Sequence, residues 1–331
     1  MPSSMQIHTS ANSPPSLITG IGGFVGNHLA KHLLDSGEKV HGIDMMPDCK
    51  VEGVGYSRID ITDPRALGEL LRAVRPANVY HLAAVSYLPQ ADATPRRAIS
   101  TNILGTVSLL DAVKVACPAA RVLAVGSSKE YGFHAGHSKL TEETAADPSD
   151  FYAISKFSAE MVARQYVHQF GLDIRFTRSF NHTGPGQSPR FVCSDWARQV
   201  AEIEHAGASP ELSVGTIDFE IDFADVRDVV RAYRLLLRHG RKGEVYNVCT
   251  GQTTALKEIL EYLCAKSSRS ITVSHSAGKV RSHRASPRLA GDPGKLQEQT
   301  GWKPEIPLMK TLDDLYAFWS QVVKAKQRRR G

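Results

Sequence analysis

The sequence predicts an α/β fold, in which a doubly wound parallel sheet carries a smaller, discontinuous α/β domain, and three observations support this prediction. The first half of the chain alternates short β-branched runs with amphipathic stretches, the pattern of parallel strands covered by helices. A glycine-rich turn directly follows the first of these runs. Beyond about residue 180 the alternation weakens, and glycine and proline residues mark a loop-rich crossing.

Each element follows from its own hydrophobic period. Short apolar runs predict buried strands, in chain order at 16–19, 39–44, 78–82, 121–125, 172–177 and 245–249. Apolar residues at helical spacing predict helices at 24–36, 99–116, 152–170, 196–205, 226–237 and 255–265. Gly171 is predicted to cap the third of these helices, because glycine readily adopts the left-handed conformation that ends a helix.

The chain has 331 residues, more than one hydrophobic core usually serves, so we expect two domains. The large sheet domain is expected over 16–180 and 222–250, and the smaller domain over 181–221 and 251–323. The polar, Ser- and Pro-rich residues 1–15 are expected to form a disordered leader, and residues 324–331 a basic tail.

The net charge of +6 has a local origin. Five positive charges lie within the last eight residues, and the rest of the chain carries only +1. Since no nucleic-acid-binding motif accompanies this charge, we expect no nucleic-acid partner. No apolar run approaches the roughly 20 residues that span a bilayer, and no signal peptide is recognisable. We therefore expect no membrane association and a cytoplasmic location.

Cysteine and histidine spacing argues against a metal site. The five cysteines are far apart and form no Cys-x-x-Cys pair, so we expect buried, reduced thiols rather than a zinc knuckle or a disulfide framework. His134 and His137 stand three residues apart, but no third ligand is evident nearby in the sequence. We therefore expect no metal.

The glycine-rich turn between the first strand and the first helix predicts a dinucleotide site. Gly20, Gly23 and Gly26 stand at G-x-x-G-x-x-G spacing. The first glycine permits the tight turn, the second lets backbone approach a pyrophosphate, and the third lets helix and strand pack closely. The helix N-terminus favours the phosphate charge. Because a strand precedes this turn and a helix follows it, the pattern predicts a Rossmann-type domain.

An acidic residue at the end of the second strand bears on the choice of cofactor. Asp44 stands 18 residues after Gly26, where a carboxylate can accept hydrogen bonds from both adenosine ribose hydroxyls. The carboxylate would also repel a 2′-phosphate, so the sequence favours NAD, with NADP still possible. A solvent-exposed turn aspartate is the alternative. Asp60 and Ile61, at the end of the next strand, are expected to meet the adenine.

Tyr152 and Lys156 lie four residues apart and share one face of a predicted helix. An ammonium group beside a phenol stabilises its phenolate, and a nicotinamide cation would add to this effect. The pair can therefore exchange a proton at a carbinol carbon near neutral pH. Ser127 follows the strand 121–125 at the sheet edge where such folds place active sites, and its hydroxyl can bridge a substrate oxygen and the phenol. Taken alone, Tyr-x-x-x-Lys would be an exposed pair of helix side chains.

These motifs together resemble the extended short-chain dehydrogenases/reductases, in the NAD-dependent epimerase/dehydratase branch. The resemblance rests on the turn at 19–26, the Ser-Ser-x-x-Tyr-Gly element at 127–132, the Tyr/Lys pair, and Gly-Trp-Lys-Pro at 301–304. It implies that Ser127 orients the substrate, that Tyr152 is the general acid/base, and that Lys156 is its electrostatic partner and contacts the nicotinamide ribose. The further cofactor contacts expected are Phe24, Val25, Leu82, Ala83, Ala84 and Asn102.

The segment 179–187, Ser-Phe-Asn-His-Thr-Gly-Pro-Gly-Gln, looks most like the branch that uses GDP-mannose derivatives, which contains 4,6-dehydratases and 4-keto reductases. The runs 191–204 and 223–228 look more like the reductases. The resemblance implies that Asn181 binds a sugar nucleotide, and a turn-forming side chain is the alternative. The further substrate contacts expected are Ser86, Ser128, Lys129, Glu130, Arg190, Arg281 and Arg284.

The reaction type turns on one position. A 4,6-dehydratase removes a proton from C5 and protonates the departing C6 hydroxyl, so it needs an extra acid/base group. The family supplies this group two residues after the active-site hydroxyl, where this chain has Lys129. Glu130 is one residue off, and its side chain is expected to point away. The sequence therefore favours reduction of the 4-keto group of a GDP-4-keto-6-deoxyhexose. Dehydration or epimerisation on tightly bound NAD is the nearest alternative, and a non-catalytic nucleotide-binding protein is a third.

Two departures from the family's pattern concern the nucleotide. Ile221 and Ser282 stand where related enzymes usually carry arginine, whose fork binds a diphosphate bidentately. Either the nucleotide is held differently or the substrate has changed. The resemblance also implies that the helices 99–116 and 152–170 pair across a two-fold axis, so we expect a homodimer.

Overall fold

The structure is a computed structural model that describes residues 13–133, 139–276 and 288–329. Its contacts divide the chain into two compact units, each discontinuous in sequence. Unit 1 comprises the chain up to Glu130, then Ser149–Arg178 and Val230–Tyr246. Unit 2 comprises Tyr131–Pro148, Ser179–Val229 and the chain from Asn247 onward. The leader expected from the sequence lies outside the described residues as far as position 12.

Unit 1 is built on a seven-stranded sheet. Its strands are β1 (Ser16–Thr19), β2 (Val40–Asp44), β3 (Gly55–Arg58), β4 (Asn78–His81), β5 (Arg121–Ser127), β6 (Asp173–Ser179) and β11 (Val245–Val248). The strand order is β11-β6-β5-β4-β1-β2-β3, and the pairs from β3 through β5 are parallel. The order reverses between β1 and β4, which is the switch point where such sheets bind ligands. The predicted doubly wound parallel sheet is confirmed.

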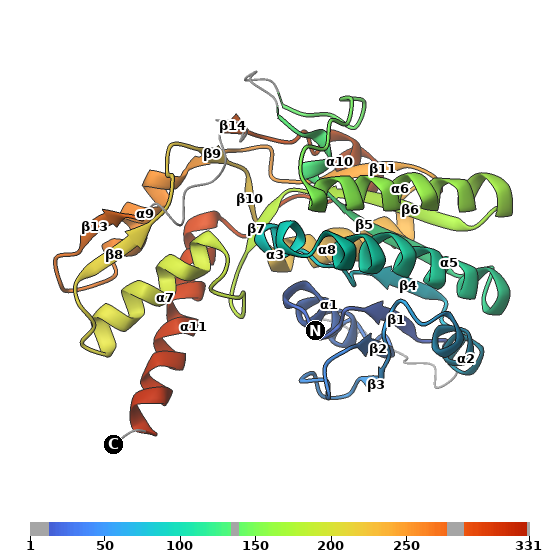
Figure 1. Cartoon of the computed structure of the whole chain (residues 1–331), viewed down its shortest axis with the longest axis horizontal. Helices are drawn as coiled ribbons and strands as arrows, with labels where there is room; N and C mark the ends of the chain where they lie inside the picture. Colours follow the sequence, from blue (N-terminus) through green and yellow to red (C-terminus); the bar gives the residue numbers. More distant parts are fainter. Residues whose placement is uncertain (1–12, 134–138, 277–287, 330–331) are drawn as a thin grey trace, which may run out of the picture. The chain divides into compact units, whose positions relative to one another are not determined.

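Helices cover the sheet on both faces (Figure 1). They are α1 (Phe24–Asp35), α2 (Pro64–Val74), α3 (Leu88–Ala93), α4 (Pro95–Ile99), α5 (Gly105–Ala116), α6 (Phe151–Phe170) and α8 (Val226–His239). On one face α2 packs on α5 and α5 packs on α6. The core under these helices joins Leu17 and Val79 of the strands to Leu71, Leu110 and Tyr166 of the helices.

The opposite face of the sheet belongs to α1 and α8. Side chains alternate along a strand, so the buried Ile18 and Tyr80 point away from the core described above. Glu38, which follows α1, accepts hydrogen bonds from Arg234 Nε at 2.7 Å and Arg238 Nη2 at 3.0 Å on α8. This ion-pair cluster joins the two helices of that face.

The region predicted as a single helix over 99–116 is divided among three consecutive helical pieces, α4, a π-helical turn and α5. A π-helical turn, η1 (Ser100–Leu104), separates α4 from α5. The wider turn brings Asn102 inward, where it is 2% exposed and its carbonyl accepts a hydrogen bond from the Thr106 hydroxyl. By length and composition Pro95–Ala116 is apolar enough to cross a membrane. It packs against α2 and α6, however, and 44% of its most apolar window is buried in the protein.

Unit 2 contains short sheets and a layer of helices. Its strands are β7 (Asn181–Thr183), β8 (Glu211–Val214), β9 (Glu220–Ile221), β10 (Phe223–Asp225), β12 (Thr254–Ala255), β13 (Thr272–His275) and β14 (Arg288–Leu289). Its helices are α7 (Val192–His205), α9 (Leu256–Cys264), α10 (Gly294–Thr300) and α11 (Leu308–Arg328). Trp196, Leu260 and Leu315, one from each of α7, α9 and α11, lie in one hydrophobic core.

Most predicted boundaries agree with the structure within two residues. Gly171 caps α6 with a left-handed φ of 69°, as predicted. The strand predicted to stop at 125 continues to Ser127, because Gly126 lets the backbone run close to the Thr177 carbonyl of β6. Helix α7 begins at Val192, four residues before its predicted start.

Candidate active site

The turn between β1 and α1 has positions that only glycine can fill. Gly20 adopts a φ of 73°, and a Cβ there would lie 2.8 Å from the backbone nitrogen of Ala83. A Cβ on Gly26 would lie 2.4 Å from the Gly20 carbonyl oxygen. The Gly23 N–H donates to the same oxygen at 3.1 Å, which closes the turn. This tight main-chain cradle before a helix N-terminus fits a dinucleotide pyrophosphate.

Asp44 ends β2 beside this turn. Its Oδ2 accepts a hydrogen bond from the Gly22 N–H at 3.0 Å, and its Oδ1 accepts one from the Met46 N–H at 3.2 Å. The half-buried carboxylate is therefore held against the glycine turn, in the place expected for a contact to the adenosine ribose.

Asn102 supports the loop that follows β4. Its Oδ1 accepts from the Val85 N–H at 2.8 Å, and its Nδ2 donates to Ser155 Oγ at 2.8 Å on α6. Ser155 in turn donates to the carbonyl of Tyr152 at 2.8 Å. The sequence led us to expect Asn102 as a cofactor contact. Its buried amide holds this loop against α6, and the predicted contact with a cofactor stays a prediction.

Ser127, Tyr152 and Lys156 come together at the carboxyl end of β5. Ser127 is the last residue of the strand, and the other two lie one turn apart on α6, which packs against β5. The Ser127 hydroxyl hydrogen-bonds the Tyr152 phenol, and its oxygen also accepts from the Lys129 N–H at 3.2 Å. The structure thus assembles the three residues predicted to be catalytic, while their roles stay predictions.

Burial controls the protonation of this group. It raises the pKa of Tyr152 to about 12, with the hydrogen bond to Ser127 acting in the opposite direction. Burial also lowers the pKa of Lys156 to about 8, while Glu130 raises it. The sequence led us to expect that Lys156 lowers the pKa of the Tyr152 phenol toward 7. In the protein alone Tyr152 is instead protonated at neutral pH, which is the state that can donate a proton.

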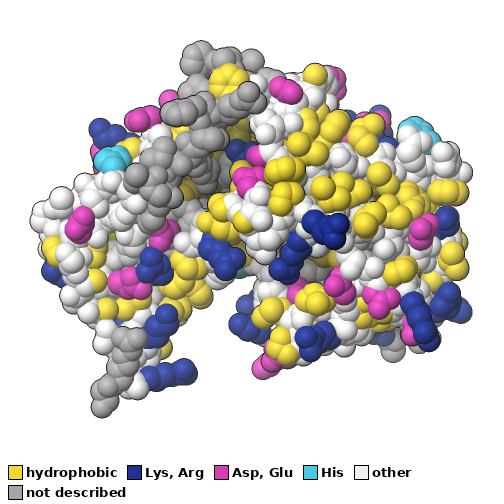
Figure 2. Space-filling model, in the orientation of Figure 1, with side chains coloured by type: hydrophobic (Ala, Val, Ile, Leu, Met, Phe, Trp, Pro, Cys, Tyr) yellow, Lys and Arg dark blue, Asp and Glu magenta, His cyan; other side chains and the backbone are white. Residues whose placement is uncertain are grey.

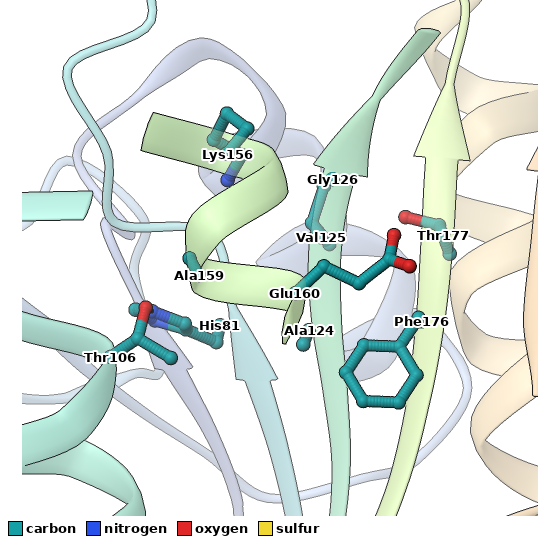
Figure 3. A pocket seen from close by; sticks show the side chains of 10 residues that line it. All are labelled: His81, Thr106, Ala124, Val125, Gly126, Lys156, Ala159, Glu160, Phe176 and Thr177. Atoms are coloured by element: carbon teal, nitrogen blue, oxygen red, sulfur yellow. The ribbon is translucent and has the colours of Figure 1, made fainter. Parts of the chain in front are cut away.

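A cavity of about 20 Å³ lies beneath these residues (Figure 3). Lys156 and Glu160 of α6, His81 of β4 and Gly126 of β5 contribute to its lining. The carboxylate of Glu160 points toward Gly126 and Thr177 (Figure 3). The end of β5 therefore rests on a polar interior rather than on a purely apolar core.

Glu130 belongs to this interior and corrects one prediction. Its side chain is 0% exposed, its Oε1 accepts from the Ser127 N–H at 2.7 Å, and its Oε2 lies 3.4 Å from Arg178 Nε. Burial raises the pKa of Glu130, and the neighbouring Glu160 raises it further. The expectation that Glu130 contacts the substrate is wrong, because no part of its side chain reaches the surface.

The other cofactor and substrate contacts predicted in unit 1 lie after β5, near the ends of β3 and β4, and around the glycine turn. Ser128 and Lys129 follow Ser127 on a 3₁₀ turn, η2 (Ser128–Tyr131), and Ser86 is exposed after β4. Asp60 is also exposed, and its Oδ1 accepts from the Thr62 N–H and hydroxyl. The remaining contacts expected around the glycine turn and β4 are Phe24, Val25, Ile61, Leu82, Ala83 and Ala84, of which Ile61 is 5% exposed.

The substrate contacts expected from the second half of the chain lie in unit 2 or outside the described residues. Asn181 lies in β7 of unit 2, and the exposed Arg190 lies in the loop before α7. Arg281 and Arg284 lie outside the described residues. Their predicted roles in substrate binding stay predictions. Among the described residues no cluster of His, Cys, Asp and Glu could hold a metal ion.

The sequence did not predict a buried chain of hydrogen bonds that runs from Thr106 through His81 to Thr19. Thr106 donates its hydroxyl to the Asn102 carbonyl at 2.7 Å, so its oxygen accepts from His81 Nε2 at 2.9 Å. His81 Nδ1 is then left to accept from Thr19 Oγ1 at 2.8 Å. Burial lowers the pKa of His81 to about 3, so the ring is neutral. A lone histidine in an apolar strand gave no signal of this role.

Asn27 is a second residue that the sequence reading missed. Its Nδ2 donates to the carbonyls of Ile21 at 3.0 Å and Gly23 at 2.8 Å, both in the glycine turn. An amide four residues after the middle glycine, on the first turn of a helix, was the available signal.

Comparisons with known proteins agree with this geometry. A sequence model of the GDP-mannose 4,6 dehydratase family matches residues 17–315. The chain is 34% identical over 308 residues to the GDP-6-deoxy-D-mannose reductase of Pseudomonas aeruginosa, which covers 93% of this chain and 97% of that protein. It is 28% identical over 320 residues to a dTDP-glucose 4,6-dehydratase of Xanthomonas campestris, with 87% and 88% covered.

A solved structure is also similar over most of its length. The structure of RMD from Pseudomonas aeruginosa, complexed with NADPH, matches with a TM-score of 0.81 and 33% sequence identity. The match covers 93% of this chain and 99% of that one.

Proposed function

Since this chain belongs to the GDP-mannose 4,6 dehydratase family, we propose that it reduces the 4-keto group of a GDP-4-keto-6-deoxyhexose with a nicotinamide cofactor. The product would be GDP-rhamnose or a related deoxysugar nucleotide. One observation carries the proposal: Ser127, Tyr152 and Lys156 meet at the end of β5, with Lys129 where a dehydratase requires an acid. The reductase of Pseudomonas aeruginosa, at 34% identity, supports the same reaction.

The cofactor is a nicotinamide dinucleotide, NAD or NADP, and the residues of unit 1 fit it. The glycine cradle after β1 leaves no room for a Cβ at Gly20 or Gly26, as a pyrophosphate site requires. Asp44 lies against that cradle and favours a free ribose, whereas the similar structure from Pseudomonas aeruginosa is complexed with NADPH. When bound, the reduced cofactor supplies a hydride to the carbonyl carbon.

The side chains around Ser127 supply the other half of the reduction. The Ser127 hydroxyl orients the carbonyl oxygen beside the phenol of Tyr152, to which it is hydrogen-bonded. Tyr152, protonated at neutral pH because burial raises its pKa, donates its proton to that oxygen. Lys156, buried one turn along α6, then stabilises the phenolate. Ketone plus hydride plus proton gives the alcohol, so no further group is needed.

The residue at position 129, a lysine, distinguishes the proposed reduction from a dehydration. Loss of water across C5 and C6 needs a base for the C5 proton and an acid for the leaving hydroxyl. Within η2 the only carboxylate is that of Glu130, and its side chain is 0% exposed beneath the strand. A 4,6-dehydratase or epimerase with tightly held NAD is therefore the alternative that the experiment must distinguish.

The experiment follows the absorbance of the reduced cofactor while purified protein meets GDP-4-keto-6-deoxy-mannose with NADH and, separately, with NADPH. We expect cofactor oxidation and a GDP-deoxyhexose that is two hydrogens heavier than the substrate. No oxidation with either cofactor would refute the proposal for this sugar. Conversion of GDP-mannose to a 4-keto product without added cofactor would instead identify a dehydratase.

We also propose that the protein acts as a homodimer in the cytoplasm. Hydrophobic side chains gather over α5 and α6 (Figure 2). Those exposed on α4–α6 and the η1 turn are Ile99, Leu104, Val115, Phe151, Ile154, Met161 and Phe170, from 42% to 66% exposed. So many apolar side chains on adjoining helices suit a second copy of this chain. Light scattering should give the mass of two chains, and a single-chain mass would contradict the proposal.

A further inference from the structure

The backbone at the end of β2 is held by side chains of the neighbouring edge strand, β3. The Tyr56 hydroxyl donates to the carbonyls of both Asp44 and Met46. Arg58 Nε donates to the carbonyl of Met45 at 3.1 Å. Three consecutive carbonyls at the end of β2 therefore accept hydrogen bonds from two β3 side chains, and one of these side chains carries a positive charge.

The pairing of β2 with β3 makes Arg58 a neighbour of Asp44, the residue expected to contact the adenosine ribose. The chain has no arginine between these two positions. In the parallel ladder, however, Asp44 and Arg58 are register partners, and paired strands lie about 4.8 Å apart. Arg58 is exposed, and within the described part of the chain no carboxylate lies within ion-pair distance of its guanidinium. Its charge is therefore not neutralised by a protein partner.

The hydrogen bond to Met45 leaves most of the Arg58 donors available. A guanidinium has five N–H donors in a planar fork. Only the Nε donor is bonded, and the terminal nitrogens have no hydrogen-bond partner among the described residues. A side chain that is already held in place loses less conformational freedom when it binds a ligand. The fork of Arg58 therefore suits an oxyanion at the end of β2.

Asp44 and Arg58 favour different groups at the 2′ position of the ribose. A free 2′-hydroxyl can donate to the Asp44 carboxylate. A 2′-phosphate carries about two negative charges at pH 7, so the carboxylate repels it and a guanidinium attracts it. Because both side chains lie at the end of the same pair of strands, the site offers an acceptor for the hydroxyl and donors for the phosphate.

We propose that Arg58 is a specificity-determining residue: its guanidinium binds the 2′-phosphate of NADP, so that the protein accepts this cofactor despite Asp44. The proposal rests on the nicotinamide cofactor of the proposed function and concerns which form of that cofactor binds. A purely structural role for Arg58, limited to holding the Met45 carbonyl, would affect NAD and NADP equally.

The test uses two nucleotides that differ only in the 2′-phosphate, adenosine 5′-monophosphate and adenosine 2′,5′-bisphosphate. Calorimetric titration gives the Kd of each for wild type and for Arg58→Gln. We expect Arg58→Gln to weaken bisphosphate binding about ten- to a hundredfold, the worth of one charged hydrogen bond, and to leave monophosphate binding within about twofold. Equal weakening of both nucleotides would reduce Arg58 to a structural role. A wild-type protein that does not bind the bisphosphate, or an unchanged Kd in the variant, would overturn the proposal.

Two control variants separate charge and loop geometry from direct recognition. Lys50→Gln removes the same charge from the same β2–β3 connection, and Lys50 is exposed and not bonded to the backbone of residues 44–46. It should leave both Kd values close to those of wild type. Tyr56→Phe removes the other anchor of this backbone without changing its charge, so it should change both Kd values by the same factor. A selective loss of bisphosphate binding in either control would contradict the role assigned to Arg58.

The complete cofactors provide a second readout that needs no sugar substrate. The fluorescence of NADPH and of NADH reports the Kd of each, and Arg58→Gln should raise the ratio of the NADPH value to the NADH value. Added salt should narrow the difference between wild type and variant, because exposed charges are screened. If the protein binds the cofactors but does not reduce the keto sugar, the proposed function fails while this comparison still stands. A ratio that is equal in wild type and Arg58→Gln would refute the role of Arg58.

Discussion

The turn after β1 and the end of β5 lie in the same sheet, with only β4 between their strands, yet different forces hold them. Main-chain contacts fix the turn, where a Cβ at Gly20 or Gly26 would collide with backbone atoms. The end of β5 rests on the buried ion pair of Glu130 and Arg178. Backbone geometry does not titrate, whereas buried charges do. The two regions should therefore fail in different ways when they are changed.

The largest effect is expected at the end of β5. Tyr152→Phe removes the proton donor but keeps the ring that packs against Val85, Ala91 and Ala98. We expect kcat to fall by about 10²–10⁴-fold, the range for a general acid, with thermal stability close to that of wild type. Steady-state kinetics and a melting curve measure both.

Cofactor binding supplies the control for Tyr152→Phe. Because the glycine turn is untouched, the Kd for NADPH and NADH, measured by fluorescence titration, should stay within a few-fold of wild type. Unchanged turnover in this variant would remove Tyr152 from the mechanism and, with it, the catalytic half of the comparison.

A substitution in the glycine turn should instead act through steric overlap with backbone atoms. In Gly26→Ala the new Cβ meets the Gly20 carbonyl at 2.4 Å and the Ile21 Cα at 2.7 Å, and neither backbone atom can yield. We expect about 1–3 kcal/mol of lost stability and a weaker Kd for either cofactor. The pH profile of the remaining kcat should keep its shape, because no titrating group has moved.

Gly68→Ala is the matched control for this substitution. Gly68 lies in α2, and its added Cβ would meet only the flexible Arg72 guanidinium, at 3.6 Å. Alanine is the better helix former by about 1 kcal/mol, so this variant should be as stable as wild type or more so. A Gly26→Ala protein that binds cofactor normally would contradict the steric account of the turn.

A pH titration of stability addresses the chain of hydrogen bonds between the two regions. Burial holds the pKa of His81 at about 3, against an ordinary value of about 6.5. Between these values the unfolded chain binds a proton that the folded chain refuses. The contribution of His81 to the free energy of unfolding should therefore fall by about 1.4 kcal/mol for each pH unit between 6.5 and 3.

Variants at two histidines test whether His81 causes this dependence of the unfolding free energy on pH. His81→Gln cannot titrate and still offers a donor to Thr106 and an acceptor to Thr19, so denaturant unfolding at pH 5 and 7 should show a smaller difference than in wild type. His168→Gln, on the exposed face of α6, should leave the difference unchanged. If the two variants gave equal slopes, His81 would not be the source.

The same contrast explains what the sequence could predict. The turn and the helix bearing Tyr152 follow from glycine spacing and hydrophobic period, which are local properties, so β1 matches its predicted bounds and α6 differs by one residue. Glu130, Asn102 and His81 each have at least one partner that lies 17 or more residues away along the chain. Their polar side chains interrupt apolar runs, and only the folded sheet shows what each one binds.

The smallest effect should come from Asp44, the charged residue held against the glycine turn. Its substitution tests most directly whether the turn and the end of β5 act independently. The Asp44 carboxylate is held by the Gly22 N–H at 3.0 Å, where it can accept from a ribose and would repel a 2′-phosphate. Asp44→Ala should raise the KM for NADH by about tenfold, the worth of one charged hydrogen bond, and lower the KM for NADPH. Because Asp44 touches neither Tyr152 nor Lys156, kcat with either cofactor and its pH profile should not change. A ratio of the two KM values equal to that of wild type would mean that cofactor choice is made elsewhere. A shifted kcat–pH profile would mean that the turn and the end of β5 are coupled after all.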